Sequence, residues 1–481
     1  MGKLTDKVAR GVFWVLLEKC GVQGVQFVVT MILARLLTPD DYGTVALLSV
    51  FIAISNVLVD SGFGKALVQR KNATQTDFNT VFYISLAVSC AAYAALFFGA
   101  PLVARFYGLS VLVPMLRVLA VTVFLNALNG VQNAELNRKM LFRLSFRVSW
   151  TSAVVSAVTG VGLALGGFGA WALVWSRIAG ALAGAVMRQV VIAWRPTRTF
   201  SWASARALFS FGWKSAVSSV VNDIYQDIYS LIIGKLYSRA DLAFLNKGMR
   251  LPALLGGLTN GSLTRVSFPA FSSMQNDIRR MRHAMLRLIR VSMFFVVPSM
   301  VLLAFSADSI VLILFGEKWL PAVPYLRLTC LIRVLTPVRT INSQVTEAFG
   351  RSDIQLKLNV LMKVLCLMNI VFFLPRGIVE FLTVDAVFLN GIGLVVFLWP
   401  NRRLIGCSFV DQLANLLPCL VAGGGMGATL FALDGISWGG AGFRLLALGA
   451  AGAVAYLGLS LLVNRPTCSD VLSRLSKRRQ P

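Results

Sequence analysis

Long apolar stretches follow one another along nearly the whole chain and are separated by short polar segments. A helix that crosses a bilayer needs about 20 mainly apolar residues, whereas a transmembrane β-barrel shows alternating segments of about 10 residues. The pattern therefore predicts an all-α polytopic membrane protein without an extramembrane domain. About fourteen spans are predicted, at residues 12–37, 42–67, 80–104, 113–135, 145–167, 169–193, 208–234, 249–273, 284–306, 322–348, 356–375, 380–400, 411–434 and 440–463.

Basic residues alternate between the two sides of this predicted bundle. With the N-terminus inside, the cytoplasmic segments hold about 27 Lys and Arg, against about 10 on the other side. Positive loops resist translocation, so the asymmetry predicts that both termini are cytoplasmic. The net charge of +26 is explained in the same way, and we expect no nucleic-acid partner. Only 14% of the residues are charged, against about 25% in soluble proteins.

One helix–turn–helix joint occurs twice. ILARLLTPDDYGTVA at residues 32–46 matches IIGKLYSRADLAFLN at residues 232–246 at several positions, although two apolar segments can also resemble each other by chance. A spacing of 200 residues with six spans per copy predicts two parallel, pseudo-symmetric six-helix lobes, a transporter plan with its site at the lobe interface. The expected parts are an N-terminal lobe at 1–200, a C-terminal lobe at 201–403, two additional helices at 404–464 and a basic cytoplasmic tail at 465–481.

Charged residues inside the predicted spans are the candidates for function. Each costs at least about 2.5 kcal/mol at the centre of a helix, so such residues usually face a wet cavity or a partner. Cations outnumber anions in the second lobe, which favours an anionic ligand, and the guanidinium fork suits phosphate oxygens. The candidate substrate-binding residues, which would form a cationic cavity, are Lys19, Arg177, Lys214, Arg265, Arg333, Arg339 and Lys363.

Acidic residues within the spans are candidates for ion coupling, namely Glu18, Asp60, Asp223 and Asp227. Asp223 and Asp227 are four residues apart and share one helix face. Two close carboxylates raise each other's pKa, which suits proton coupling. The structural alternative is that they form ion pairs with Lys214 or Arg265. Asp385 is a further charge, in the twelfth span.

Other kinds of chemistry find little support in the sequence. No GxxxxGK[ST] loop is present, so ATP hydrolysis is not expected. The seven cysteines include no CxxC pair, and the single histidine, His283, has no catalytic partner. We expect no cofactor, no metal site and no catalytic residue.

Four segments, in order along the chain, resemble a known family. They are LARLLTPDDYG (33–43), DSGFGKALVQRK (60–71), IIGKLYSRADLAFLNKG (232–248) and VSFPAFS (266–272). Together they are similar to polysaccharide flippases of the multidrug/oligosaccharidyl-lipid/polysaccharide exporter (MOP) superfamily, in particular the colanic and teichuronic acid exporters. The resemblance covers roughly residues 5–400 and leaves the last two spans generic.

The resemblance implies two six-helix lobes around a central cationic cavity. It also implies a non-enzymatic protein that turns an undecaprenyl-pyrophosphate-linked oligosaccharide to the outer leaflet by alternating access, in many members with an ion gradient of H⁺ or Na⁺. The implied location is the cytoplasmic (inner) membrane of a bacterium. The implied partners are the lipid-linked oligosaccharide, membrane lipids and polymerases or glycosyltransferases. The family usually has other residues where Asp223 and Asp227 stand, which weakens their coupling role.

Two other functions compete with this interpretation. A small-molecule antiporter of the multidrug branch would share the fold, but a few acidic residues in a mainly apolar cavity would be expected, and the Arg and Lys excess argues against it. A membrane enzyme such as a polymerase or ligase would use long outer loops or soluble domains, which the sequence lacks. Asp40 and Asp41, which resemble a metal-binding pair, are explained better as residues of a first helical turn.

Overall fold

The computed structural model describes most of the chain. The described residues are 18, 21–60, 67, 74–139, 141–192, 194–207, 228–436 and 439–463. Among them every regular element is a helix, as the apolar pattern predicts. The chain divides into two compact units, Met1–Ala243 and Phe244–Pro481.

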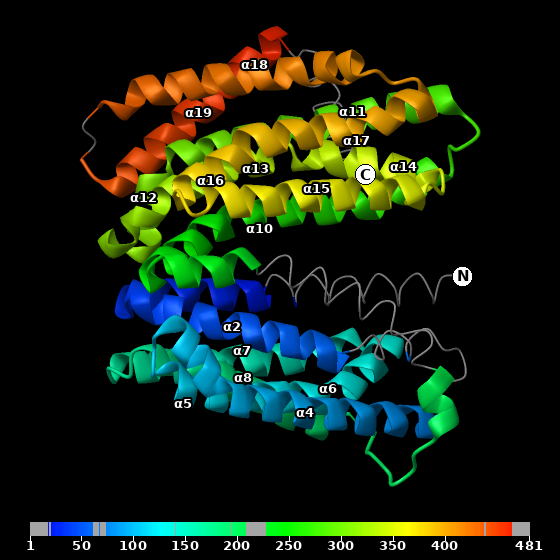
Figure 1. Cartoon of the computed structure of the whole chain (residues 1–481). Helices are drawn as coiled ribbons and strands as arrows, with labels where there is room; N and C mark the ends of the chain where they lie inside the picture. The colour runs from blue at the N-terminus through cyan, green and yellow to red at the C-terminus, as the bar shows by residue number, and fades with distance from the viewer. Residues whose placement is uncertain are drawn as a thin grey trace. The chain divides into compact units, whose positions relative to one another are not determined.

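The first unit is a bundle of long apolar helices (Figure 1). Helices α7 and α8 lie side by side, and α4 packs against α5 and α6. Its described elements are the apolar helix Gly21–Leu36, α2 (Pro39–Asp60), α4 (Gln75–Tyr107), α5 (Leu112–Leu119), α6 (Val121–Arg138), α7 (Phe142–Leu165), α8 (Ala170–Val191) and the start of α10 (Arg239–Ser272).

The second unit contains the rest of α10 and all later helices. Several of its helices are broken into shorter pieces, and one piece, η2, is a π-helix. Its elements are α11 (Ile278–Phe305), α12 (Ala307–Phe315), η1 (Glu317–Ala322), α13 (Val323–Val334), α14 (Thr336–Ala348), α15 (Ser352–Phe373), α16 (Ile378–Val384), η2 (Asp385–Leu389), α17 (Asn390–Ile405), α18 (Phe409–Asp434) and α19 (Ala441–Val463).

Ten helical segments of the described part are long and apolar enough to cross a membrane. The chain is therefore a multi-pass membrane protein. The predicted spans at 12–37, 42–67, 169–193 and 208–234 lie partly outside the described residues, so the number fourteen stays a prediction. The predicted span at 249–273 corresponds to the second part of α10, which ends at Ser272, and the one at 322–348 is divided between α13 and α14.

The repeated joint has the same local structure in both places. Thr38 donates from its N–H and hydroxyl to Asp41 Oδ2 at 2.9 and 2.7 Å, and Asp41 N–H donates back to Thr38 Oγ1 at 3.2 Å. Ser238 and Asp241 make the same three hydrogen bonds at 3.2, 2.7 and 3.0 Å. This is a capping box, which satisfies the free N–H groups at the start of α2 and of α10.

The two joints also touch each other within the first unit. A Cβ placed on Gly43 would lie 1.9 Å from the backbone oxygen of Arg239, so only glycine permits this approach. Arg239 Nε lies 3.5 Å from Asp40 Oδ1, and its Nη1 donates to Thr44 Oγ1 at 3.3 Å. The contact therefore joins the beginnings of α2 and α10.

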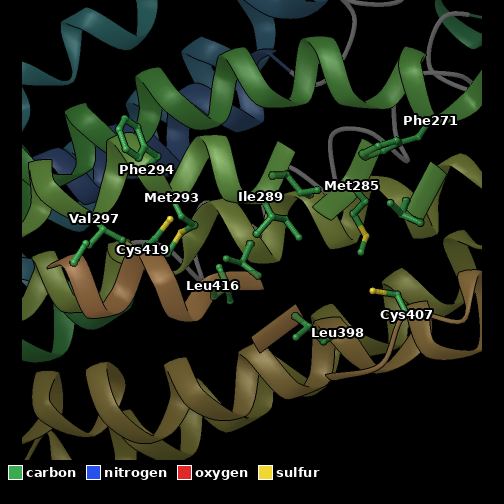
Figure 2. Close-up of a cluster of buried hydrophobic side chains, with 14 of the residues drawn as sticks. Phe271, Met285, Ile289, Met293, Phe294, Val297, Leu398, Cys407, Leu416 and Cys419 are labelled. Carbon is green, nitrogen blue, oxygen red and sulfur yellow. The ribbon is translucent and has the colours of Figure 1, made fainter. Parts of the chain in front are cut away.

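Helices α18 and α19 belong to the core of the second unit. Figure 2 shows Met293 and Val297 of α11 near Cys419 and Leu416 of α18. From α19, the Tyr456 hydroxyl donates to the Phe294 carbonyl at 3.0 Å. The helix pair is therefore packed into this unit by its own apolar side chains.

A buried amide network ties α18 to the same unit. Asn342, Asn401 and Gln412, from α14, α17 and α18, are all fully buried. Asn342 Nδ2 donates to Gln412 Oε1 at 2.9 Å, and Asn401 Nδ2 donates to Asn342 Oδ1 at 2.6 Å. Such bonds fix the register of the three helices because an unpaired buried amide is costly.

Candidate functional site

The break between α13 and α14 places two of the predicted arginines. Arg333 lies in the last turn of α13, and Leu335 follows with φ −89° and ψ 0°. Pro337 then stands in the first turn of α14, where its missing N–H does no harm. A proline farther inside a helix would remove a hydrogen bond and clash with the preceding turn, so the sequence favours two short helices here.

Each of these two arginine side chains passes close to a glycine of another helix. Arg333 Cδ lies 3.9 Å from where a Cβ of Gly256 would stand, on α10. Arg339 Nη1 lies 3.1 Å from the corresponding point of Gly393, on α17. A side chain at Gly393 would therefore press on the guanidinium group of Arg339, whereas a methyl group at Gly256 would make an ordinary contact with Arg333.

The surroundings of the two arginines are polar. Thr340 Oγ1 donates to Asn260 Oδ1 at 3.5 Å, and Asn390 Nδ2 donates to the Leu331 carbonyl at 3.0 Å. Arg333 Nε is buried and has no hydrogen-bond partner. We call Arg333, Arg339 and the nearby Asp385 the arginine cluster; its donors could bind an anion with several oxygens.

The structure brings together only part of the predicted cationic set. Arg333 and Arg339 interact electrostatically, and both interact with Asp385. Lys363 is half-buried on α15, next to Met362, whose methyl group also touches the Gly393 position. The side chain of Arg265 is not described. Lys214 and the acidic pair of Asp223 and Asp227 lie outside the described residues.

In the first unit, Arg177 joins two helices. Its Nη1 on α8 donates to Ser49 Oγ on α2 at 2.6 Å, while the side chain remains exposed. Lys19 lies outside the described residues, and the side chain of Asp60, at the end of α2, is not described.

Glu18 belongs to a second polar group. Its Oε1 accepts hydrogen bonds from Ser149 at 2.7 Å and from Ser145 at 3.2 Å, both on α7. It also interacts electrostatically with Arg188 of α8, whose Nε donates to Asn133 Oδ1 at 3.0 Å. Glu18 is thus held by hydroxyl groups and lies near a cation.

Arg188 was not among the predicted site residues, although its spacing from Arg177 could have indicated it. It follows Arg177 by eleven residues, or about three helical turns, so the two lie on nearby faces of α8. Placed near the end of a predicted span, Arg188 could be taken for an interfacial residue.

Helix α6 carries a buried amide that the sequence analysis also missed. Gln132 is fully buried, and neither polar atom of its side chain has a hydrogen-bond partner. Asn129, one turn earlier, is 5% exposed and its Oδ1 also lacks a partner. Buried polar groups are usually paired, so this face of α6 suits water or a polar ligand.

Metal-ligating side chains do not gather in the described part of the chain, where no group of three or more His, Cys, Asp or Glu could hold an ion.

Comparison with known proteins identifies the family. The sequence model of the family described as polysaccharide biosynthesis protein matches residues 32–324, more than half of the chain. The chain belongs to this family. The match begins in the first joint and includes both copies of it.

Curated relatives cover most of the chain. It is 26% identical over 360 residues to the teichuronic acid biosynthesis protein TuaB of Bacillus subtilis, a match to 74% of each chain. It is 28% identical over 334 residues to the succinoglycan biosynthesis transport protein ExoT of Rhizobium meliloti, covering 69% of this chain and 68% of that one. The lipopolysaccharide biosynthesis protein WzxC of Escherichia coli is 23% identical over 363 residues, covering 74% of this chain and 73% of WzxC.

Solved structures show the same fold at low identity. The lipid II flippase MurJ in an inward closed conformation aligns over 95% of this chain and 99% of its own, with a TM-score of 0.75 and 15% identity. An inward-facing multidrug transporter of the MATE family covers 82% of this chain and 98% of its own, with a TM-score of 0.62 and 15% identity. The chain therefore has the fold of these two structures, which agrees with the fold that the resemblance implied.

Proposed function

We propose that the chain is a flippase for an undecaprenyl-pyrophosphate-linked oligosaccharide, or a related surface polysaccharide precursor. It acts by alternating access in the cytoplasmic membrane of a bacterium, with both termini in the cytoplasm. The observation that carries the proposal is the arginine cluster, because it sets two guanidinium groups at a helix break within a family of polysaccharide biosynthesis proteins.

Moving a charged sugar headgroup across the bilayer requires polar contacts of the kind that the arginine cluster can provide. A sugar headgroup cannot cross a bilayer alone, because each hydroxyl would lose its hydrogen bonds in hydrocarbon. A flippase has to offer polar contacts to the headgroup while the prenyl tail stays in lipid. Arginines at a break between helices can bind phosphate oxygens in pairs and so offset the loss of hydration.

The membrane potential assists this direction of movement. Carrying roughly two negative charges outward from a negative interior releases about 4.6 kcal/mol per 100 mV. We propose H⁺ or Na⁺ as candidate coupling ions, with Glu18, which accepts hydrogen bonds from Ser145 and Ser149, as a candidate carboxylate for this role. No covalent step is needed; the partners would be lipids and the polymerases or glycosyltransferases of the pathway.

Complementation of a deletion strain tests the proposal. Each of the single variants Arg265→Ala, Arg333→Ala and Arg339→Ala should abolish surface polysaccharide while the protein remains in the membrane. Arg403→Ala is the matched control, because Arg403 is exposed at the end of α17. Normal polysaccharide with all three variants would exclude binding by these arginines.

The structural similarity to multidrug transporters favours one second candidate, a small-molecule antiporter with the same fold. This function predicts that the deletion strain becomes more sensitive to cationic drugs and keeps its surface polysaccharide. The flippase predicts the opposite on both counts.

A further inference from the structure

Asp385 is a carboxylate inside a membrane-spanning helix. It is half-buried and lies in the span formed by α16, η2 and α17, Ile378–Ile405. An acidic residue at such a place is costly unless it faces water or a cation.

The π-helix sets the direction of Asp385. Each residue of an α-helix turns the chain by about 100°, whereas a π segment takes one extra residue to complete its turn. Gly393 follows Asp385 by eight residues, and this interval includes the π segment Asp385–Leu389. Because of the extra residue in the π turn, the eight residues rotate the chain as much as about seven residues of α-helix, which is about two turns. Asp385 and Gly393 consequently share one helix face.

Arg339 lies across that same face. Its Nη1 is 3.1 Å and its Cδ 3.6 Å from the Cβ position of Gly393. Asp385 interacts electrostatically with Arg339 and with Arg333. The glycine contact places Arg339 on the face of the span that carries Asp385, and α13, which carries Arg333, packs against the π segment that begins with Asp385.

The carboxylate is near the arginines without being bound to them. Within the described part of the chain, no N···O distance of 4.0 Å or less joins Asp385 to Arg333 or Arg339. The guanidinium donors therefore remain open to an incoming anion, while Asp385 offsets part of their charge. Two cations and one anion leave the cluster with a single net positive charge.

We infer that Asp385 is an internal competitor of the substrate diphosphate. The inference rests on the proposed function of the arginine cluster. The carboxylate weakens binding of the diphosphate, and it again neutralises part of the charge of the arginines when the headgroup leaves. A carrier needs such a balance, because a site must bind strongly enough to load and weakly enough to release.

Binding of inorganic pyrophosphate to the purified full-length protein in lipid nanodiscs tests the inference. Asp385→Asn should tighten binding by about tenfold, equal to about 1.4 kcal/mol, while Asp385→Glu should bind as the wild type does. Glu380→Gln is the matched control, because Glu380 is an exposed carboxylate on the same helix, one turn and a half earlier. Asp385→Ala is measured as well, so that a folding defect of one variant does not decide the result.

A gain of affinity separates competition from a structural role, since a structural defect would weaken binding. The gain should also become smaller in the background Arg339→Ala, because one of the two arginines for which Asp385 and the anion compete is then missing. In proteoliposomes, Asp385→Asn should lower both the substrate concentration for half-maximal flipping and the maximal rate. Unchanged or weaker pyrophosphate binding in both Asp385→Asn and Asp385→Ala would overturn the inference.

The two proposals fail in different ways. If Arg339→Ala and Arg333→Ala bind pyrophosphate as the wild type does, the arginine cluster is not the binding site and the proposed function loses its support. If these variants lose binding but Asp385→Asn does not gain it, only the competition is wrong.

Discussion

Replacing Gly43 with alanine should force apart the two helix joints of the first unit. The new methyl group would stand 1.9 Å from the carbonyl oxygen of Arg239, 2.4 Å from its carbonyl carbon and 2.9 Å from its Cα. All three are backbone atoms, so a side-chain rotation cannot relieve the overlap. The joint must open or one helix must shift.

The expected cost follows from two opposing terms. Overpacking a tight contact costs typically about 1–3 kcal/mol, and backbone neighbours place Gly43→Ala at the upper end. Replacing a helical glycine with alanine stabilises the helix by about 1 kcal/mol, which offsets part of this cost. We therefore expect a net loss of about 1–2 kcal/mol, or roughly 2–4 °C in Tm for each kcal/mol in a unit of this size.

Thermal unfolding of the purified protein in detergent, followed by tryptophan fluorescence, measures this loss. Gly162→Ala is the matched control, since Gly162 is a helical glycine of α7 whose added Cβ would meet nothing within 4 Å. Its Tm should stay equal or rise. If Gly43→Ala unfolds at the same temperature as Gly162→Ala, the close contact between the joints does not exist in solution.

Three further predictions concern the capping boxes, the amide network and a buried thiol. Asp41→Ala and Asp241→Ala should each lower stability by about 1 kcal/mol in the same thermal assay, because each removes the same capping bonds; a large effect at only one would contradict the repeat. Asn342→Ala should cost about 1–3 kcal/mol, since Gln412 is left buried without its partner; an unchanged Tm would refute that role. Burial raises the pKa of the Cys407 thiol, so at pH 8 a variant retaining only this cysteine should react more slowly with maleimide than the same variant in denaturant; equal rates would show that the thiol is accessible.

The sequence predicted the helical membrane fold because hydrophobic length and charge asymmetry are properties of each segment alone. It also predicted the repeated joint, with Asp40 and Asp41 in a first helical turn, because such a turn is specified locally. The pairing of Asp41 with Thr38, and of Asp241 with Ser238, was not predicted. The break between α13 and α14 was less visible. Pro337 signals it, but residues 322–348 are apolar enough to be taken for one span.

The site was harder to predict because it depends on contacts between distant segments. The charge pattern selected Arg333 and Arg339, and the structure places them on either side of one break. The charge pattern did not select Arg188. It also assigned no role to Asp385, because the helix face on which this residue lies depends on a π-helix that no sequence period reveals. The partnerless amide of Gln132 could not be recognised either, because its burial comes from the packing of α6 against other helices.

Flipping of a lipid-linked glycan by the purified protein is the most direct test of the account. Proteoliposomes would contain an undecaprenyl-pyrophosphate-linked oligosaccharide, and a glycosidase added outside would report how much of it reaches the outer leaflet over time. The account predicts fast exchange with the wild-type protein and with Arg403→Ala, and exchange near that of empty liposomes with Arg339→Ala. Equal rates for wild type and Arg339→Ala, or no exchange with the wild type, would contradict it.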